Sequence, residues 1–359
     1  MTQDPPLVRL LTPAGERLHR DDFDVDITAE DLYELYRDMV MVRRIDAEAT
    51  ALQRQGELGL WAPLHGQEAA QVGSGRALAD DDFVFPTYRE HGVAYTRGVP
   101  PVQVLGLFRG TTNGGWDPAA HNFGLYTIVI GTQTLHAVGY AMGLQRRSGG
   151  GDGRTPAVVA YFGDGASSQG DVNEAFVWAA VMAAPTVFFC QNNQWAISAP
   201  SDRQSRIPLY RRAEGFGFPG IRVDGNDVLA VLAVTGRTLE YARTGGGPSL
   251  IEAYTYRMGA HTTSDDPSRY RAHGDVASWV EQDPLKRVRL YLTACDLMDP
   301  AVERALDDEA EELAARLRAD ARALPDPDRG SMFDHVYAEP HPLIDAERAA
   351  LAASWASEV

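Results

Sequence analysis

The stretch YFGDGASSQGDVNEAFVWAAVMAAPTVFFCQNNQWAIS, residues 161–198, decides the fold of this chain. It starts within a short apolar run at 157–162 and contains a second run at 186–191, and both are typical of buried strands. The residues between them, from about 170 to 183, are predicted to form a helix. A strand, a helix and a strand in such close succession make a parallel crossover unit. Its right-handed connection places both strands in one sheet.

The same alternation continues downstream of this unit. A strand is predicted within GIRVDGND (220–227), a helix then runs through Ala242, and SLIEAYTY (249–256) forms a further strand. Strands that alternate with helices are typical of α/β proteins. The expected fold is therefore a doubly wound, mostly parallel sheet with helices on both faces.

Helices are predicted at both ends of this α/β region. Thr28, with Asp31 three residues later, indicates a capping box at the start of a helix over about 29 to 55. Beyond Asp299 the chain becomes rich in Ala, Glu, Leu and Arg, which indicates a surface helix. Before Thr28 there is little periodicity, so we expect an arm that lies on a surface or on a partner. The expected division is an N-terminal arm (1–27), an α/β domain (28–300) and a helical C-terminal extension (301–359).

Composition excludes several classes of protein. The 359 residues carry a formal net charge of −17, which opposes binding to nucleic acid because a phosphate backbone is bound by clustered positive charge. The two cysteines, Cys190 and Cys295, are too few for a disulfide framework and favour a reducing cytosol. The N-terminus lacks a cationic and apolar leader, and no apolar stretch reaches the roughly 20 residues that span a bilayer. We therefore expect a cytoplasmic protein without a membrane segment.

Polar side chains follow both strands of the crossover unit. Asp164 comes after the first strand and Asn193 after the second, and ligands in parallel sheets bind where these carboxyl ends converge. Carboxylate and amide oxygens suit Mg²⁺ or Ca²⁺. Gly163 and Gly165 let the backbone approach phosphate oxygens, and the following helix presents unpaired N–H groups. The alternative is a strand-end turn with polar caps, and for Asn192 a capping role is the preferred interpretation.

The spacing of these residues resembles a known signature. The sequence Gly163-Asp164-Gly165 is followed after 26 residues by paired asparagines, as in thiamine diphosphate-binding enzymes. The whole 161–198 stretch looks like the alpha subunits of pyruvate and branched-chain 2-oxo acid dehydrogenases, and the resemblance covers roughly residues 30 to 295. Further matching segments are HGQEAA (65–70), FPTYREHG (85–92), IGTQTLHAVG (130–139), VDGND (223–227) and YRMGAHTTSDDPSRYR (256–271).

The resemblance implies a set of residues that bind thiamine diphosphate and Mg²⁺. Asp164, Asn193 and the backbone carbonyl of Trp195 would hold the metal, and Arg89 would bind the diphosphate through its two-pronged guanidinium. The alternatives are a helix-capping salt bridge for Arg89 and ordinary core packing for Ile128 and Ile130. The full expected cofactor-binding set is Tyr88, Arg89, Ile128, Ile130, Asp164, Gly165, Ala166, Gln191, Asn193 and His261.

His261 would be the catalytic residue, in a loop near the thiazolium ring. A histidine titrates close to neutral pH, so it is able to donate or relay protons; the alternative is a structural loop histidine. We expect Arg257, Asp265 and Tyr270 to fix this loop, and His65 and His91 to have structural or supporting roles. GTQ at 131–133 resembles the branched-chain type, in which a potassium ion would be surrounded by Thr127, Val129, Thr132 and Gln133.

The chain also departs from the family pattern. Gln191 stands where branched-chain enzymes often carry an arginine for the diphosphate, so one charged contact is missing or comes from elsewhere. Ala260 replaces a second loop histidine. The region 111–126 lacks the usual Met-Pro-Val-His ending, which leaves the role of His121 open. Thr262 occupies the position of a serine that is phosphorylated in animal enzymes, and no kinase is inferred from it.

The implied activity is decarboxylation of a 2-oxo acid and reductive acylation of a lipoyl group on an acyltransferase core. A second cofactor-binding domain does not fit in this length, so a beta subunit is expected in an assembly of two alpha and two beta chains. Branched 2-oxo acids are the favoured substrates, with pyruvate second and acetoin third. Two alternatives of other classes are a non-catalytic scaffold subunit and a metal-dependent phosphatase, and the phosphatase would not explain 85–92 or 256–271.

Overall fold

The computed structural model describes residues 7–112, 114–148 and 154–356. Its centre is a five-stranded sheet in which every neighbouring pair of strands is parallel. In β2–α7–β3 the chain forms the predicted crossover unit, and β2 and β3 are direct neighbours. The order across the sheet is β1 (Phe83–Phe85), β2 (Val158–Gly163), β3 (Thr186–Asn192), β7 (Ser249–Tyr254) and β6 (Gly220–Asp224), and α7 is Gly170–Val181.

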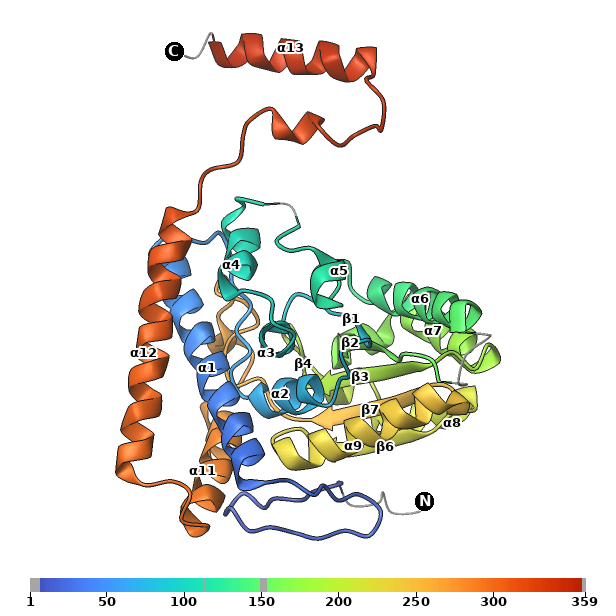
Figure 1. Cartoon of the computed structure of the whole chain (residues 1–359), viewed down its shortest axis with the longest axis vertical. Helices are drawn as coiled ribbons and strands as arrows, with labels where there is room; N and C mark the ends of the chain where they lie inside the picture. The colour runs from blue at the N-terminus through green and yellow to red at the C-terminus, as the bar shows by residue number, and fades with distance from the viewer. Residues whose placement is uncertain (1–6, 113, 149–153, 357–359) are drawn as a thin grey trace.

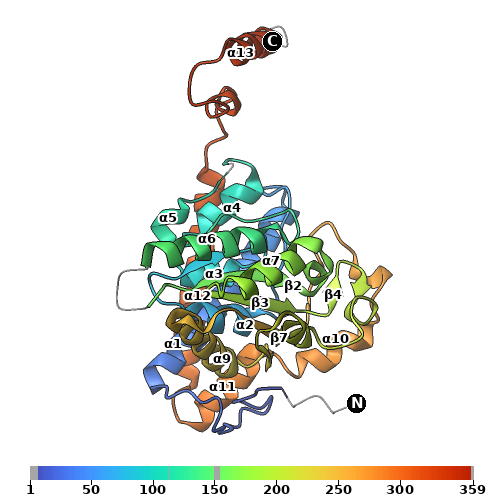
Figure 2. The ribbon, with the colours of Figure 1, turned by 90° about the vertical axis from the view of Figure 1, so that its right-hand side faces the viewer.

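Helices cover both faces of this sheet (Figures 1 and 2). Successive strand residues point to opposite faces, so Val159 and Tyr161 of β2 enter one apolar cluster and Val158, Ala160 and Phe162 enter the other. The doubly wound α/β prediction is confirmed. The first face packs against α1 (Ala29–Arg54), α2 (Glu68–Arg76) and α9 (Val228–Tyr241), and the second against α6 (Thr132–Ser148), α7 and α8 (Arg212–Phe216).

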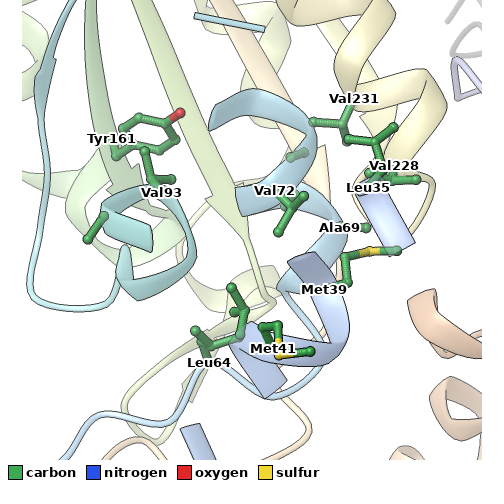
Figure 3. Packing of buried hydrophobic residues seen from close by; sticks show 14 of the residues in the cluster. Leu35, Met39, Met41, Leu64, Ala69, Val72, Val93, Tyr161, Val228 and Val231 are labelled. Atoms are coloured by element: carbon green, nitrogen blue, oxygen red, sulfur yellow. The ribbon is translucent and has the colours of Figure 1, made fainter. Parts of the chain in front are cut away.

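The larger cluster holds the elements that carry the candidate site. Figure 3 shows Met39 of α1 beside Ala69 of α2, with Val72 of α2 and with Val228 and Val231 of α9 close to them. These five side chains are fully buried. Burial of a large apolar side chain contributes about 1.5–3 kcal/mol, so this packing fixes α2 against the sheet.

The long first helix begins where the sequence predicts. The Thr28 hydroxyl accepts a hydrogen bond from the Asp31 N–H at 3.1 Å and donates to the Asp31 carboxylate at 2.6 Å. The C-terminal helix α12 (Pro300–Ala323) packs along α1, and Arg318 donates to both oxygens of Glu48 at 2.7 Å. The last helix, α13 (Pro342–Ala356), lies apart from the α/β body and has no buried residue (Figure 1).

The described part of the N-terminal segment lies on the open edge of the sheet. Val8 forms a parallel bridge with Val223 of β6, and the N–H groups of Leu10 and Leu11 both donate to the Asp227 carboxylate, at 2.7 and 2.6 Å. Leu10 and Leu11 are fully buried in the larger cluster. The segment thus covers strand β6 and joins the core of the α/β domain.

None of the described helices is long and apolar enough to cross a lipid bilayer.

The remaining elements are short. The other helices are α3 (His91–Thr96), α4 (Pro101–Arg109), α5 (Pro118–His121), α10 (His273–Val280) and α11 (Pro284–Ala294), and β4 (Trp195–Ala196) pairs antiparallel with β5 (Ala199–Pro200). Five 3-10 turns (Asp164–Ser168, Ser201–Arg203, Leu209–Arg211, Pro267–Arg269, Ser331–Phe333) and a π turn (Ala242–Gly246) complete the set.

Candidate active site

A cavity of about 440 Å³ opens at the carboxyl ends of β1, β2 and β3. It brings together segments that are far apart in the sequence: the turn after β1, the loop before α6, the turns after β2 and β3, and the loop after β7. Every residue of the expected cofactor-binding set lines it, as do Trp195, Thr127 and Gln133, whereas Val129 and Thr132 are not among its lining residues.

Asp164 and Asn193 stand side by side at the end of neighbouring strands, since Gly163 pairs with Gln191 in the register of β2 and β3. Burial raises the pKa of Asp164 to about 6, and a hydrogen bond from Gln204 (3.1 Å) opposes this shift. A Cβ at Gly165 would lie 2.6 Å from the Ala196 Cβ, so this turn needs glycine. A buried carboxylate that receives only neutral donors is stabilised by a cation.

The loop after β3 orients the other two expected metal ligands. Asn193 donates through Nδ2 to Gln67 Oε1 at 3.1 Å, which turns its Oδ1 away from α2. The Trp195 carbonyl accepts a hydrogen bond from Arg257 at 3.2 Å and keeps a second lone pair. Asn192 donates to Glu252 at 2.7 Å and accepts from the Gln194 N–H at 3.1 Å, so the capping interpretation is confirmed.

The donor set is that of a hard cation. In the described ranges, no three His, Cys, Asp or Glu side chains gather into a metal site. The candidate site instead combines one carboxylate, one amide oxygen and one backbone carbonyl. All three are oxygen ligands, the type that Mg²⁺ and Ca²⁺ prefer.

Arg89 provides positive charge in the same cavity. Its guanidinium donates to the Pro63 carbonyl at 2.5 Å and to the His261 carbonyl at 2.8 Å, and it is 6% exposed. Within the described residues, no carboxylate forms an ion pair with Arg89, so the salt-bridge alternative is wrong. A buried guanidinium without a carboxylate partner is suited to an anionic ligand.

His261 is held beside this guanidinium. Arg89 Nη2 lies 3.2 Å from His261 Nδ1, and because arginine is always a donor, Nδ1 is the acceptor. Burial and the charges of Arg89 and Arg257 lower the pKa of His261 to about 4. The ring is therefore neutral near pH 7, with its proton on Nε2, where it is available as a hydrogen-bond donor.

The loop that carries His261 is fixed by the residues that the sequence indicates. The Asp265 carboxylate accepts the His261 N–H at 2.8 Å and the Tyr270 hydroxyl at 2.5 Å. Arg257 in turn donates to the Tyr270 hydroxyl at 2.9 Å. Since Arg257 also contacts the Trp195 carbonyl, one side chain links the histidine loop to the loop of the expected metal ligands.

The apolar residues before α6 lie on the surface. Ile128 is 64% exposed and Ile130 is 40% exposed, so the alternative that they are core residues is wrong. Next to them, Gln133 donates to the Tyr161 carbonyl at 2.7 Å, while its Oε1 atom is buried without a partner. Thr132 donates its hydroxyl to Asp171 at 3.2 Å. This segment thus offers an exposed apolar rim and an unsatisfied oxygen.

The other histidines near the site have different surroundings. His91 is buried between the Tyr126 hydroxyl (2.9 Å) and the Ala62 carbonyl (3.0 Å), and burial lowers its pKa to about 3, which is consistent with a structural role. His65 contributes its carbonyl to the Met258 N–H at 3.2 Å. His121 ends α5 and does not line the cavity.

Four polar residues around the cavity were not singled out by sequence reasoning. Gln67 and Gln204 contact the expected metal ligands Asn193 and Asp164. Glu90 lines the cavity, and Gln71 lies behind it; both are buried. The only sequence signal for Gln67, Gln71 and Glu90 was their place inside or beside the segments 65–70 and 85–92. Gln204 lies outside every matching segment. A single polar side chain has no pattern that separates a contact in the site from one on a surface.

Comparisons with known proteins find relatives that match most of the chain. The chain is 45% identical over 357 residues to the 3-methyl-2-oxobutanoate dehydrogenase subunit alpha of Mycobacterium tuberculosis (strain ATCC 25618 / H37Rv), an alignment that covers 99% of this chain and 96% of the relative. It is 38% identical over 319 residues to the pyruvate dehydrogenase E1 component subunit alpha of Staphylococcus epidermidis (strain ATCC 12228 / FDA PCI 1200), covering 88% of this chain and 83% of the relative. The family model for the dehydrogenase E1 component matches residues 36–328. The chain therefore belongs to the dehydrogenase E1 component family.

Proposed function

We propose that this chain is the alpha subunit of a branched-chain 2-oxo acid dehydrogenase that uses thiamine diphosphate and Mg²⁺. One observation carries the proposal: in a single cavity, neither the buried Asp164 carboxylate nor the buried Arg89 guanidinium forms an ion pair with another described residue. Buried charges of this kind are costly unless a ligand compensates them. A metal-bound diphosphate supplies both missing partners. A non-catalytic scaffold would have no use for either charge.

The residues of the chain fit this pair of ligands. Asp164, Asn193 and the Trp195 carbonyl would hold Mg²⁺, and the backbone at Gly165 and Ala166 would face the diphosphate at the start of a 3-10 turn. Arg89 would bind the diphosphate oxygens, with Tyr88 beside it. Ile128 and Ile130 would contact the aminopyrimidine ring, for which their exposure leaves room.

When bound, thiamine diphosphate supplies a nucleophilic carbon and an electron sink for decarboxylation. The chain contributes orientation and hydrogen bonds. His261, neutral and protonated on Nε2, would donate to the carboxylate or the oxo oxygen of the substrate. Arg89 holds the ring through Nδ1 and so keeps that proton on Nε2.

Branched 2-oxo acids are the proposed substrates. The relative named for 3-methyl-2-oxobutanoate shares more identity over more of the chain than the relative named for pyruvate. The Gly131-Thr132-Gln133 sequence supports the same choice. Pocket shape alone would discriminate weakly, because one methylene group is worth about 1–3 kcal/mol.

A beta subunit is the proposed partner, in an assembly of two alpha and two beta chains that acylates the lipoyl domain of an acyltransferase core. Large apolar side chains are exposed beside the cavity at Ile128 and Val129, which are 64% and 69% exposed. More lie on the outer face of α6 and α7. Exposed apolar surface of this kind is typical of protein interfaces. The exposed large apolar residues on α6 and α7 are Tyr140, Val177, Trp178 and Val181, together with Met182 directly after α7.

We further propose a potassium ion beside α6. The buried Gln133 Oε1 has no hydrogen-bond partner, and a cation would satisfy it. Thr127, Val129 and Thr132 would complete the site, although Thr132 now directs its hydroxyl to Asp171.

Substrate comparison tests the proposed function. The chain, purified together with its beta subunit and supplied with thiamine diphosphate and Mg²⁺, is expected to decarboxylate 3-methyl-2-oxobutanoate with a higher kcat/KM than pyruvate. A preference for pyruvate would overturn the branched-chain assignment and favour a pyruvate dehydrogenase. No activity on any 2-oxo acid would overturn the catalytic assignment itself.

A further inference from the structure

At the wall of the cavity, three buried polar side chains form a continuous hydrogen-bonded chain, in which Gln191 and Glu90 line the cavity and Gln71 lies behind them. Gln71 comes from α2, Gln191 from the end of β3 and Glu90 from the turn after β1, and none is more than 2% exposed. Gln71 Nε2 donates to Gln191 Oε1 at 3.2 Å, and Gln191 Nε2 donates to Glu90 Oε1 at 2.6 Å. These contacts join residues that are more than 100 positions apart in the sequence.

Backbone groups fix the direction of every bond in this chain. The Gly92 N–H donates to Gln71 Oε1 at 2.8 Å, so the Gln71 Nε2 atom must point the other way, toward Gln191. Gln191 therefore presents its oxygen to Gln71 and its amide hydrogens to Glu90. At the far end, the Thr87 N–H donates to Glu90 Oε2 at 2.5 Å. Glu90 thus accepts on both oxygens, as a carboxylate does.

Two of these residues, Gln71 and Glu90, hold the backbone on both sides of Arg89. Gln71 Nε2 donates to the Arg89 carbonyl at 2.9 Å, and Glu90 binds both the N–H and the hydroxyl of Thr87. A Cβ at residue 92 would lie only 3.0 Å from Gln71 Oε1, so Gly92 permits this close approach. The turn that carries Arg89 is thereby attached to the strand that leads to Asn193.

We propose that Gln191 and Glu90 are positioning residues that place Arg89 for the diphosphate, and that Gln191 acts through this chain rather than as a diphosphate ligand. The inference rests on the proposed function, since it assumes that Arg89 binds the cofactor. It also explains how the chain works without an arginine at position 191. An amide there completes the hydrogen-bonded chain without adding a charge next to Glu90.

Variants that exchange hydrogen-bond donors and acceptors at positions 90 and 191 test this role. Glu90→Gln places an NH₂ group against either the Thr87 N–H or the Gln191 amide, so one bond is lost. Gln191→Glu sets two carboxylates against each other. In the double variant E90Q/Q191E the bonds are restored, because Gln at 90 accepts from Thr87 and donates to the new carboxylate at 191, which also accepts from Gln71. The double variant has the same net charge as the wild type.

The experiment measures the Kd of thiamine diphosphate by calorimetry, at saturating Mg²⁺, on the chain purified with its beta subunit. Each single variant is expected to bind about tenfold more weakly, and the double variant within about threefold of the wild type. Gln53→Glu, near the C-terminal end of α1 and outside the lining of the cavity, adds the same charge and should leave the Kd unchanged. Circular dichroism of each variant checks that the fold is retained.

Two results would overturn the positioning role. If the double variant binds no better than Gln191→Glu, then residue 191 meets the diphosphate directly and a carboxylate there repels it. If both single variants bind like the wild type, the hydrogen-bonded chain does not govern Arg89. A wild-type protein that fails to bind thiamine diphosphate would instead refute the proposed function, so the two failures are distinguishable.

Discussion

Replacement of Asp164 by Asn should have opposite effects on stability in the absence and in the presence of cofactor. Without a metal, the raised pKa of Asp164 means that the folded state keeps its proton more tightly than the unfolded chain. The resulting destabilisation of the folded state is absent below about pH 4, grows as the pH rises toward 6, and is complete above pH 6. A shift from 3.8 to about 6 corresponds to about 3 kcal/mol of unfolding free energy.

Asn has the same shape as Asp and still accepts the hydrogen bond from Gln204, but it carries no charge. The metal-free Asp164→Asn variant should therefore be more stable than the wild type at pH 7.5 by up to about 3 kcal/mol, which is a rise in Tm of several degrees. At pH 4 the two proteins should differ little. Mg²⁺ with thiamine diphosphate should then stabilise only the wild type, by about 2.7 kcal/mol at 100 times the Kd.

Thermal unfolding followed by circular dichroism gives the Tm of each protein under four conditions: pH 4 and pH 7.5, each with EDTA or with both ligands. A metal-free variant that is less stable than the wild type at pH 7.5 would refute the reasoning, because the carboxylate would then already have a favourable partner in the folded chain. Equal stabilisation of both proteins by the ligands would refute Asp164 as a metal ligand.

Three further outcomes are expected from other parts of the site. Arg89→Ala removes a positive charge beside His261, so the pKa of that histidine should rise from about 4 toward 6.5 in an NMR titration. An unchanged pKa would show that the Arg89 charge does not act on His261. If a potassium ion binds beside α6, the wild type should have a higher Tm in KCl than in tetramethylammonium chloride, and Gln133→Leu should abolish this difference. No difference in the wild type would exclude the ion. Ile128→Asp should leave the fold intact but prevent association with the beta subunit in gel filtration. Leu18→Asp, at another exposed position, should leave this association unchanged. A normal complex with Ile128→Asp would exclude this rim from the interface.

Much of the fold follows from local pattern. Each strand of the crossover unit is a short apolar run, and the helix between them has a different period, so 157–162 and 186–191 could be placed within a residue or two of β2 and β3. The candidate site follows from topology, because parallel strands end at one edge. Asp164 and Asn193 therefore meet once β2 and β3 are neighbours.

Other features depend on tertiary contacts that a single sequence does not encode locally. The absence of an ion pair between Arg89 and any described carboxylate depends on where every acidic residue of the described chain lies. The exposure of Ile128 reflects the lack of a covering element within this chain, although a β-branched residue is usually buried. The contact of Gln71 with Gln191 spans 120 residues and connects two neutral amides, which have no sequence signature.

We propose that this chain holds one half of a shared thiamine diphosphate site. It is tested most directly by the release of labelled carbon dioxide from carboxyl-labelled 3-methyl-2-oxobutanoate. The prediction is that release requires the alpha chain, the beta chain, thiamine diphosphate and Mg²⁺ together, and stops when any one is left out. Release by the alpha chain alone, or release that persists without thiamine diphosphate, would contradict it.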